Sequence, residues 1–114
     1  RGVVGHVVEA ADADVARALD LAAAAFPAWD RTPAAERAAV LERAADALEA
    51  RRNAFVALLV REAGRTIPDS LAEVREAVDF LRYYAAEARE RFGGAVRLPG
   101  PTGESNELRL RGRG

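Results

Sequence analysis

The chain has 114 residues, 50% of them apolar and 31% charged, and a formal net charge of −1. This composition is typical of a soluble globular chain, argues against disorder, and gives no long-range field that favours nucleic acid or an acidic membrane. With no cysteine, a single histidine and no apolar run near the length of about 20 residues that spans a bilayer, the sequence excludes a thiol nucleophile, a cysteine- or histidine-based metal site and a membrane-spanning segment.

Residues 1–10 predict one or two short strands. The β-branched pairs at positions 3–4 and 7–8 favour extended backbone, and Gly5 between them favours a turn. The histidine, His6, lies in this segment without an identifiable partner that could orient it as a base, so we interpret it as a structural or exposed residue.

Helices are expected to occupy residues 13–93. The first is expected to end near Phe26, because Pro27 disfavours its continuation. Thr32 and Pro33 predict the start of a second helix, with a hydroxyl cap followed by proline at the first helical position. The apolar stripe of this second helix consists of Leu41, Ala44, Ala45 and Leu48.

A short break at residues 51–53 precedes a third helix over residues 54–63, which is expected to stop at Gly64. The fourth and longest helix is expected to run from Thr66 to the glycines at 93–94. Its apolar residues recur at the i, i+3 and i+4 spacing of one helix face, at Leu71, Val74, Val78, Leu81 and Ala85. Charges of both signs alternate around the helices, which indicates solvated surface rather than a nucleic-acid-binding patch.

The character of the sequence changes after these glycines. Residues 95–107 contain Pro99, Pro101 and several turn residues, which predict an extended crossing segment. Residues 108–111 alternate with period two and predict a half-buried strand, for which the sequence offers no partner. The expected fold class is therefore mainly α with short terminal β-strands: short strands in residues 1–10, helices in 13–93, and an extended segment and strand in 95–114.

Three patterns could carry chemistry, and each has a plainer interpretation. Glu73 and Glu76 lie at i, i+3, but glutamates are common on helix surfaces and act as acid–base pairs only when their pKa values are pushed apart. Residues 100–104 lack the terminal lysine-serine or lysine-threonine of a phosphate loop and predict a turn. Tyr83 and Tyr84 point about 100° apart, so at most one is central in a core face, and packing is the default interpretation. The residues alone predict no self-contained active site.

The order of the motifs resembles that of the N-terminal helices of the aldehyde dehydrogenase superfamily. Residues 61–66 resemble the family's glutamate-(alanine or threonine)-glycine-lysine turn, with Arg65 where lysine is more common. The other matching stretches lie on both sides of this turn, at residues 25–29, 32–33, 36–37, 41–46 and 73–85.

Within the superfamily, one branch is most similar. Residues 4–10, 75–80 and 98–106 resemble the dehydrogenase half of the bifunctional proline-catabolic enzymes called proline utilisation A. The resemblance covers essentially the whole chain. It implies an NAD-dependent L-glutamate gamma-semialdehyde (1-pyrroline-5-carboxylate) dehydrogenase, which oxidises glutamate-5-semialdehyde to glutamate. Whether the parent enzyme is bifunctional or a stand-alone dehydrogenase is left open.

The resemblance also implies that the chain is an N-terminal fragment of the α/β aldehyde dehydrogenase fold. The family's catalytic cysteine, general-base glutamate and NAD-binding fold would follow residue 114, and FAD would belong to a proline dehydrogenase half before Arg1. No catalytic, cofactor-binding or metal-binding residue is therefore assigned. Glu76 matches a substrate-tunnel glutamate of the glutamate-semialdehyde branch, where its carboxylate would complement the substrate's α-ammonium group. The alternative is an ordinary helix-surface glutamate.

The expected partners are the remainder of the parent chain and further copies of it, joined through the end strands into a homo-oligomer. Neither nucleic acid nor a membrane is expected to bind this segment. The expected location is cytoplasmic, with peripheral membrane association of the parent left open. The fragment is expected to be inactive by itself. The alternative function is a free-standing helical protein-interaction module without catalysis. A reading frame that continues past residue 114 into a cysteine-bearing domain would favour the enzyme over this module.

Overall fold

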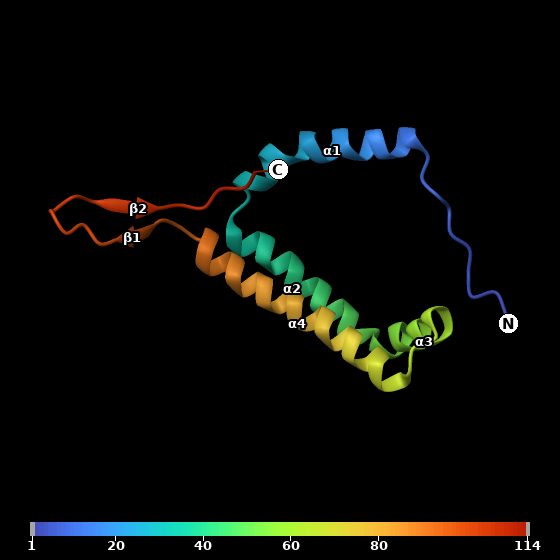
Figure 1. Cartoon of the computed structure of the whole chain (residues 1–114). Helices are drawn as coiled ribbons and strands as arrows, with labels where there is room; N and C mark the ends of the chain where they lie inside the picture. Colours follow the sequence, from blue (N-terminus) through green and yellow to red (C-terminus); the bar gives the residue numbers. More distant parts are fainter. Residues whose placement is uncertain (1, 114) are drawn as a thin grey trace.

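The computed structural model describes residues 2–113. In this part of the chain, four helices are followed by a two-stranded antiparallel hairpin (Figure 1). The molecule is elongated, measuring 71 × 38 × 21 Å. The expected fold class, mainly α with short strands, is confirmed. The helices are α1 (Asp12–Arg31), α2 (Ala34–Ala50), α3 (Arg52–Ala63) and α4 (Ile67–Phe92), and the strands are β1 (Val96–Leu98) and β2 (Asn106–Leu108).

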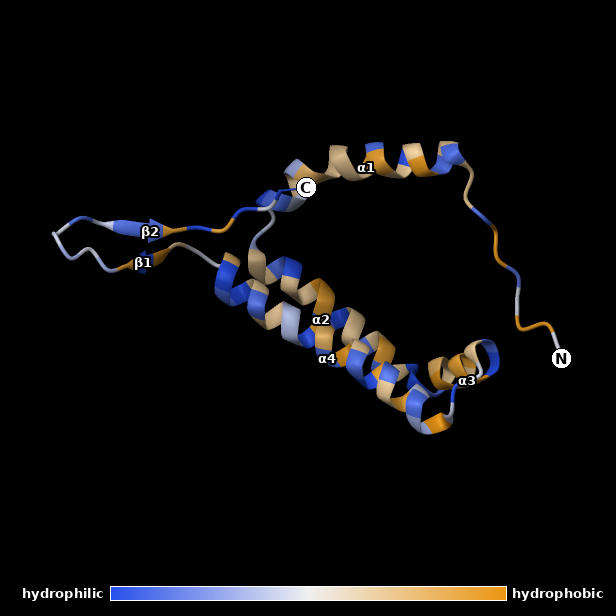
Figure 2. Ribbon diagram, in the orientation of Figure 1, coloured by the Kyte–Doolittle hydropathy of each residue, from blue (hydrophilic) through white to orange (hydrophobic). Residues whose placement is uncertain are grey.

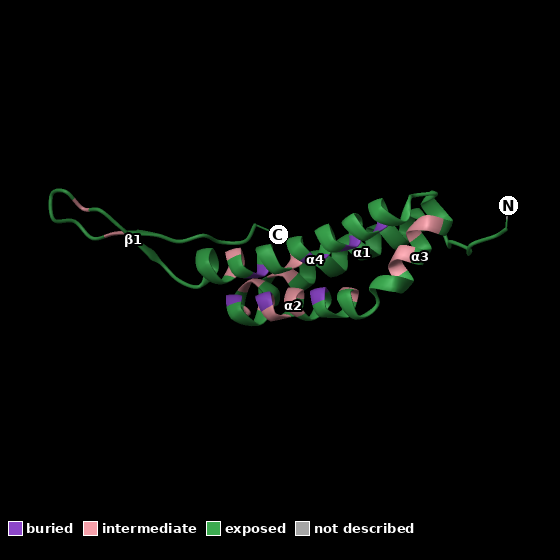
Figure 3. Cartoon of the chain, turned by 90° about the horizontal axis from the view of Figure 1, so that it is seen from below, coloured by how far each residue is buried: buried purple, intermediate pink, exposed green. Residues whose placement is uncertain are grey.

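The core lies between α2 and α4, which pack side by side, while α3 packs against α4 at the opposite end from the hairpin (Figures 1 and 3). Most of the buried side chains are small, which allows the two helix backbones to approach closely. Of the stripe predicted for this helix, Val74, Val78 and Ala85 are buried and Leu81 is half-buried, whereas Leu71 is exposed. The buried set is Ala34, Ala38 and Ala45 of α2 with Ser70, Val74, Val78 and Ala85 of α4.

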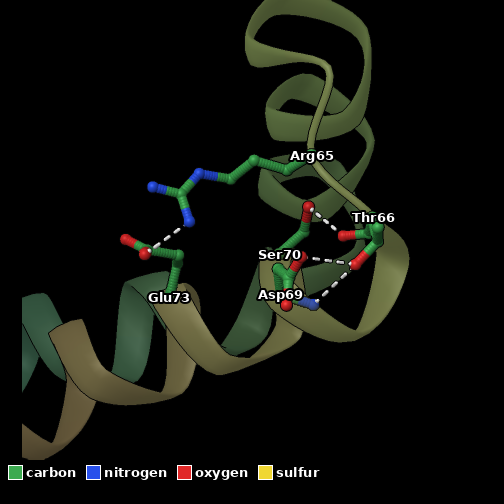
Figure 4. A network of polar contacts seen from close by, with 5 residues as sticks. All are labelled: Arg65, Thr66, Asp69, Ser70 and Glu73. Atoms are coloured by element: carbon green, nitrogen blue, oxygen red, sulfur yellow. Dashed lines mark hydrogen bonds and ion pairs between the residues drawn. The ribbon is translucent and has the colours of Figure 1, made fainter.

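A polar network fixes the start of α4 (Figure 4). The Asp69 amide donates a hydrogen bond to the Thr66 hydroxyl at 3.2 Å, as expected for a threonine N-cap. The Thr66 hydroxyl donates to the Asp69 carboxylate at 2.7 Å, and the buried Ser70 hydroxyl donates to the Thr66 carbonyl at 2.9 Å. Just before this cap, Gly64 has a φ of +67° and ends α3 in the left-handed conformation that glycine tolerates. The predicted boundary between these helices is confirmed.

Two arginines of α4 join it to α2 through charged hydrogen bonds. The Arg82 guanidinium donates to the Asp46 and Glu49 carboxylates at 3.3 and 2.7 Å. Arg89 donates through both terminal nitrogens to Glu42, with an Nη2–Oε2 distance of 2.8 Å. The hydrogen bond from Arg89 holds the pKa of Glu42 below its ordinary value, and the bonds to these carboxylates raise the pKa of both arginines.

We expect the α2–α4 pair to lose stability in acid because of Glu42. Since Arg89 holds the pKa of Glu42 below about 4.5 in the folded chain, folding stabilises the ionised carboxylate. This stabilisation is present above the pKa of the unfolded chain and is lost as the pH falls through the folded-state pKa. Urea unfolding at a series of pH values from neutral to acid measures the effect. Glu42→Gln should flatten the pH dependence, Glu90→Gln should leave it intact, and equal curves for the two variants would contradict the assignment.

The first helix is longer than the sequence predicted. α1 continues through Pro27 to Arg31 instead of ending near Phe26. Proline removes one backbone donor, yet its fixed φ is compatible with helix, and the next turn closes when the Thr32 amide donates to the Ala28 carbonyl at 3.2 Å. The Thr32 hydroxyl donates to the same carbonyl at 3.1 Å. Thr32 therefore ends α1, and the expectation that its hydroxyl caps α2 was wrong.

The N-terminal segment forms no strand among the described residues. Residues 2–10 are extended and exposed, and the sheet contains only β1 and β2, so the short strands expected over 1–10 are not formed there. Residue 1 lies outside the described residues. The β-branched pairs favour extended backbone, but a strand also needs a neighbour that accepts its hydrogen bonds.

The C-terminal segment is a hairpin rather than a crossing segment followed by an unpaired strand. β1 and β2 are antiparallel, with Arg97 opposite Glu107. The turn closes when the Gly103 amide donates to the Gly100 carbonyl at 3.0 Å, and Gly103 has a φ of +93°. The strand expected at 108–111 overlaps β2 only at its first residue, and its expected lack of a partner was wrong because this turn brings residues 96–98 back alongside it.

Helix α1 packs against none of the other described helices or strands, although its Asp30 accepts a hydrogen bond from the Gly112 amide. Figure 2 shows apolar residues along it that no other element covers, and Figure 1 shows the wide separation from α3. None of the helices within residues 2–113 combines the length and the apolarity that crossing a bilayer requires. The exposed apolar side chains of α1 include Val15, Leu19, Leu21 and Trp29.

Candidate functional site

Glu76 lies on the face of α4 that points away from the other helices. Because successive helical residues are rotated by about 100°, Glu76 is opposite the buried residues Val74, Val78 and Ala85. Its side chain is exposed. The structure therefore places the predicted site residue where a ligand or another polypeptide segment can reach it.

A shallow depression with aromatic walls runs along this face beside Glu76. Phe80 and Tyr83 are 50% and 55% exposed. The Phe80 ring stacks on Tyr84 with the ring centroids 6.0 Å apart, and Tyr83 meets Tyr84 edge to face at 5.2 Å. Neither tyrosine enters the core; the rings pack on one another. The depression is lined by Ala72, Arg75, Glu76, Asp79, Phe80 and Tyr83.

The two glutamates that the sequence paired have different surroundings. The Arg65 guanidinium donates to the Glu73 carboxylate at 2.6 Å, an ion pair that ties the α3–α4 turn to the helix (Figure 4). Arg75 and Asp79, which line the depression, form an ion pair at 3.9 Å. Among the described residues, no hydrogen bond or ion pair engages Glu76. It is the carboxylate of this surface that remains available.

The predicted turn at residues 100–104 is confirmed, and its polar groups are already used. The Glu104 carboxylate accepts hydrogen bonds from the Thr102 hydroxyl and from the Thr102 amide, the latter at 3.1 Å. The bond from the Thr102 hydroxyl lowers the pKa of Glu104. A carboxylate in this position would repel a phosphate, which agrees with the interpretation of the stretch as a turn.

The residues beside Glu76 offer charge and aromatic surface to a ligand. The chain has no cysteine, and no cluster of histidine, aspartate and glutamate within the described residues could hold a metal ion. The sole histidine, His6, is exposed. An unpaired carboxylate beside two exposed aromatic rings complements a cation, both by charge and by the negative face of each ring. The sequence indicated the carboxylate but gave no sign that the rings would be exposed beside it.

Nearly the whole chain matches a known protein family. The model of the aldehyde dehydrogenase family matches residues 1–112. The chain belongs to this family. A crystal structure of a bifunctional proline utilization A (PutA) protein superimposes on the entire chain with a TM-score of 0.89 and 51% identity. The resemblance inferred from the motifs, including its branch, is thereby confirmed.

Curated relatives show the same relationship. The bifunctional protein PutA of Klebsiella aerogenes is 49% identical over 99 residues, which make up 87% of this chain. The 1-pyrroline-5-carboxylate dehydrogenase 2 of Bacillus subtilis is 44% identical over 88 residues, or 77% of this chain. The chain spans only 8% and 17% of the lengths of these two proteins, and 12% of the solved PutA chain.

Proposed function

We propose that this chain is the opening segment of the dehydrogenase part of an NAD-dependent L-glutamate gamma-semialdehyde dehydrogenase. The proposal rests on the similarity to PutA and to 1-pyrroline-5-carboxylate dehydrogenases. This similarity covers most of this chain but only a small part of those longer proteins. In the parent enzyme, the reaction converts glutamate-5-semialdehyde to glutamate. This segment acts as scaffold and supplies one wall of the route by which the substrate enters.

We propose that the nicotinamide site, and the flavin site of a bifunctional parent, lie outside this segment. A dinucleotide site needs a glycine-rich turn that leads from a strand into a helix, and each helix between residues 12 and 92 begins after another helix or after the extended segment 2–10. NAD therefore belongs to the part of the parent outside this segment, and FAD to a proline dehydrogenase half if the parent is bifunctional. This chain contributes no step to hydride transfer.

The segment is also proposed to take part in assembly of a cytoplasmic homo-oligomer. Each strand of the hairpin is bonded on one side only within the described residues, so the outer backbone groups of β1 and β2 are open to a further strand. The extended residues 2–10 are similarly open to pairing. These edges fit other parts of the parent chain or of a neighbouring subunit.

Activity assays on the chain and on the parent test the proposed function. The purified 114-residue chain should reduce no NAD when supplied with glutamate semialdehyde, because it has neither a thiol nor a dinucleotide site. The protein expressed from the full reading frame should produce NADH and glutamate. Activity in the short chain, or a full-length protein that is inactive with this aldehyde, would overturn the proposal.

Glu76 is proposed to bind the α-ammonium group of the substrate. In the full-length protein, Glu76→Gln should lower kcat/KM for glutamate semialdehyde by about tenfold, the size expected for one charge-assisted contact. For an aliphatic aldehyde without an ammonium group, the same change should have little effect. Glu90→Gln, which removes an exposed glutamate from the same helix, is the matched control. Equal losses for both aldehydes would assign Glu76 a structural role.

A further inference from the structure

Phe80 presents an aromatic surface to the depression beside Glu76. It lies four residues after Glu76 and four before Tyr84, so the three side chains follow one another along one side of α4. The Phe80 and Tyr84 rings are stacked, with 17° between their planes. Phe80 lines the depression and is 50% exposed, whereas Tyr84 lies outside the lining. The part of the ring that Tyr84 leaves uncovered therefore faces the depression.

The charges of the depression favour a cation. Its charged lining residues are Arg75, Glu76 and Asp79, one positive and two negative, and so carry one net negative charge. Arg75 and Asp79 pair with each other at 3.9 Å, while Glu76 has no hydrogen bond or ion pair among the described residues. The available negative charge of the depression is thus located on Glu76, next to the Phe80 ring.

A carboxylate and an aromatic ring attract a cation through different properties. The carboxylate attracts any positive charge, including a hydrated metal ion. The negative face of a ring attracts an organic ammonium group, and the attraction grows as water is displaced from between them. Together the two groups select an ammonium group that is attached to a carbon chain, because its charge meets the carboxylate while its neighbouring CH groups contact the ring.

We propose that Phe80 is a specificity-determining residue, which receives the substrate's α-ammonium group on its uncovered surface while Glu76 neutralises the charge. For the identity of the ammonium group, this inference rests on the proposed function. Tyr84 stacks on Phe80 and meets Tyr83 edge to face at 5.2 Å, so these contacts hold the Phe80 ring in place. An aldehyde without an ammonium group gains nothing from Glu76 or Phe80, so the pair distinguishes an amino aldehyde from a simple one.

The binding of two dicarboxylates to the protein expressed from the full reading frame tests the proposal. L-Glutamate and glutarate have the same chain length, and only L-glutamate carries an ammonium group. Calorimetric titration should show tighter binding of L-glutamate. Phe80→Leu should reduce this preference by roughly three- to tenfold, the loss expected for one cation–π contact. Phe80→Tyr, which restores a ring, should keep the preference.

Two further variants separate recognition from folding. Trifluorophenylalanine at position 80 keeps the shape of the ring and weakens its negative face, so it should lower the preference even if Phe80→Leu does not fold. Phe92→Leu makes the leucine change at the far end of α4, outside the depression, and should keep the preference. An unmodified protein without the preference, or a preference that survives fluorination of the ring, would overturn the role of Phe80.

Glu76→Gln distinguishes a failure of this inference from a failure of the proposed function. If Glu76→Gln lowers the preference and the changes at Phe80 do not, Phe80 has no part in recognition although the role of Glu76 stands. If the preference depends on Phe80 but the protein does not oxidise glutamate semialdehyde, the ammonium site is supported and the proposed reaction is wrong.

Discussion

Replacing Ala85 by leucine is expected to disrupt the α2–α4 pair. Ala85 is 0% exposed, and the ion pairs formed by Arg82 and Arg89 place it level with Ala45 of α2, which is also 0% exposed. A leucine side chain has no room between helices that approach through alanine. Overpacking of this kind typically costs about 1–3 kcal/mol. Because few other side chains are buried in this chain, we expect a clear fall in the urea midpoint and loss of helical circular dichroism.

The neighbouring alanine provides the control for this change. Ala86 is exposed, so Ala86→Leu adds the same side chain to the same helix turn without entering the interface. Alanine and leucine have similar helix propensities, so the control should change the unfolding midpoint little. If both variants were equally stable, α2 and α4 would not be packed as closely as the burial of Ala85 indicates.

Replacing Gly100 by alanine is expected to open the β1–β2 hairpin. A Cβ atom at this position would lie 1.9 Å from the backbone oxygen of Glu104 and 3.0 Å from its carbonyl carbon. The first distance is far inside any van der Waals contact, and the clashing atom is backbone, which cannot swing aside. The turn must therefore change its path, and the hydrogen bond from the Gly103 amide to the Gly100 carbonyl is lost with it.

Hydrogen exchange resolves this effect from general unfolding. Gly100→Ala should abolish the protection of the hairpin amides at 96–98 and 106–108 while leaving that of α4 unchanged. Gly94→Ala is the matched control, because a Cβ at Gly94 meets no atom within 4 Å and lies outside the turn. Protected hairpin amides in the Gly100 variant would show that the turn tolerates a side chain.

The helices were predictable where local signals and packing agree. Gly64 and Thr66 stop and start helices through their own backbone and hydroxyl groups, so their roles could be deduced from neighbouring residues. Pro27 was misleading because a proline removes only its own backbone donor and disturbs the preceding turn, while the residues after it can still continue the helix, as they do here to Arg31. Whether a helix continues past a proline cannot be deduced from the type of residue alone.

The strands were harder to predict because pairing is not a local property. Because residues 108–111 alternate between apolar and charged side chains, the sequence predicted the strand there, later in the chain than β2. The turn at residues 100–103 determines which residues pair across the hairpin. The valines of residues 2–10 favour extended backbone but no partner for them exists among the described residues.

The candidate site could be predicted only in part. The position of Glu76 opposite the apolar stripe follows from helical periodicity, so its exposure was deducible. The absence of an ion pair at Glu76 was not deducible, because the sequence does not show that Arg65 pairs with Glu73. The uncovered surface of Phe80 also escaped sequence analysis, since it depends on how Phe80 stacks on Tyr84.

The small side chains between α2 and α4 affect how the register of the two helices is fixed. The buried residues of α2 are all alanine, so on this side the interface offers few differences in shape that would oppose a slide of one helix along the other by a turn, about 5.4 Å. Such a shift would carry Glu42 out of reach of Arg89 and break both bonds between them. The exposed arginines therefore add to the definition of the register between two helices, one of which contributes only alanines to the buried contacts. Their main contribution is to the uniqueness of the packed pair rather than to its strength.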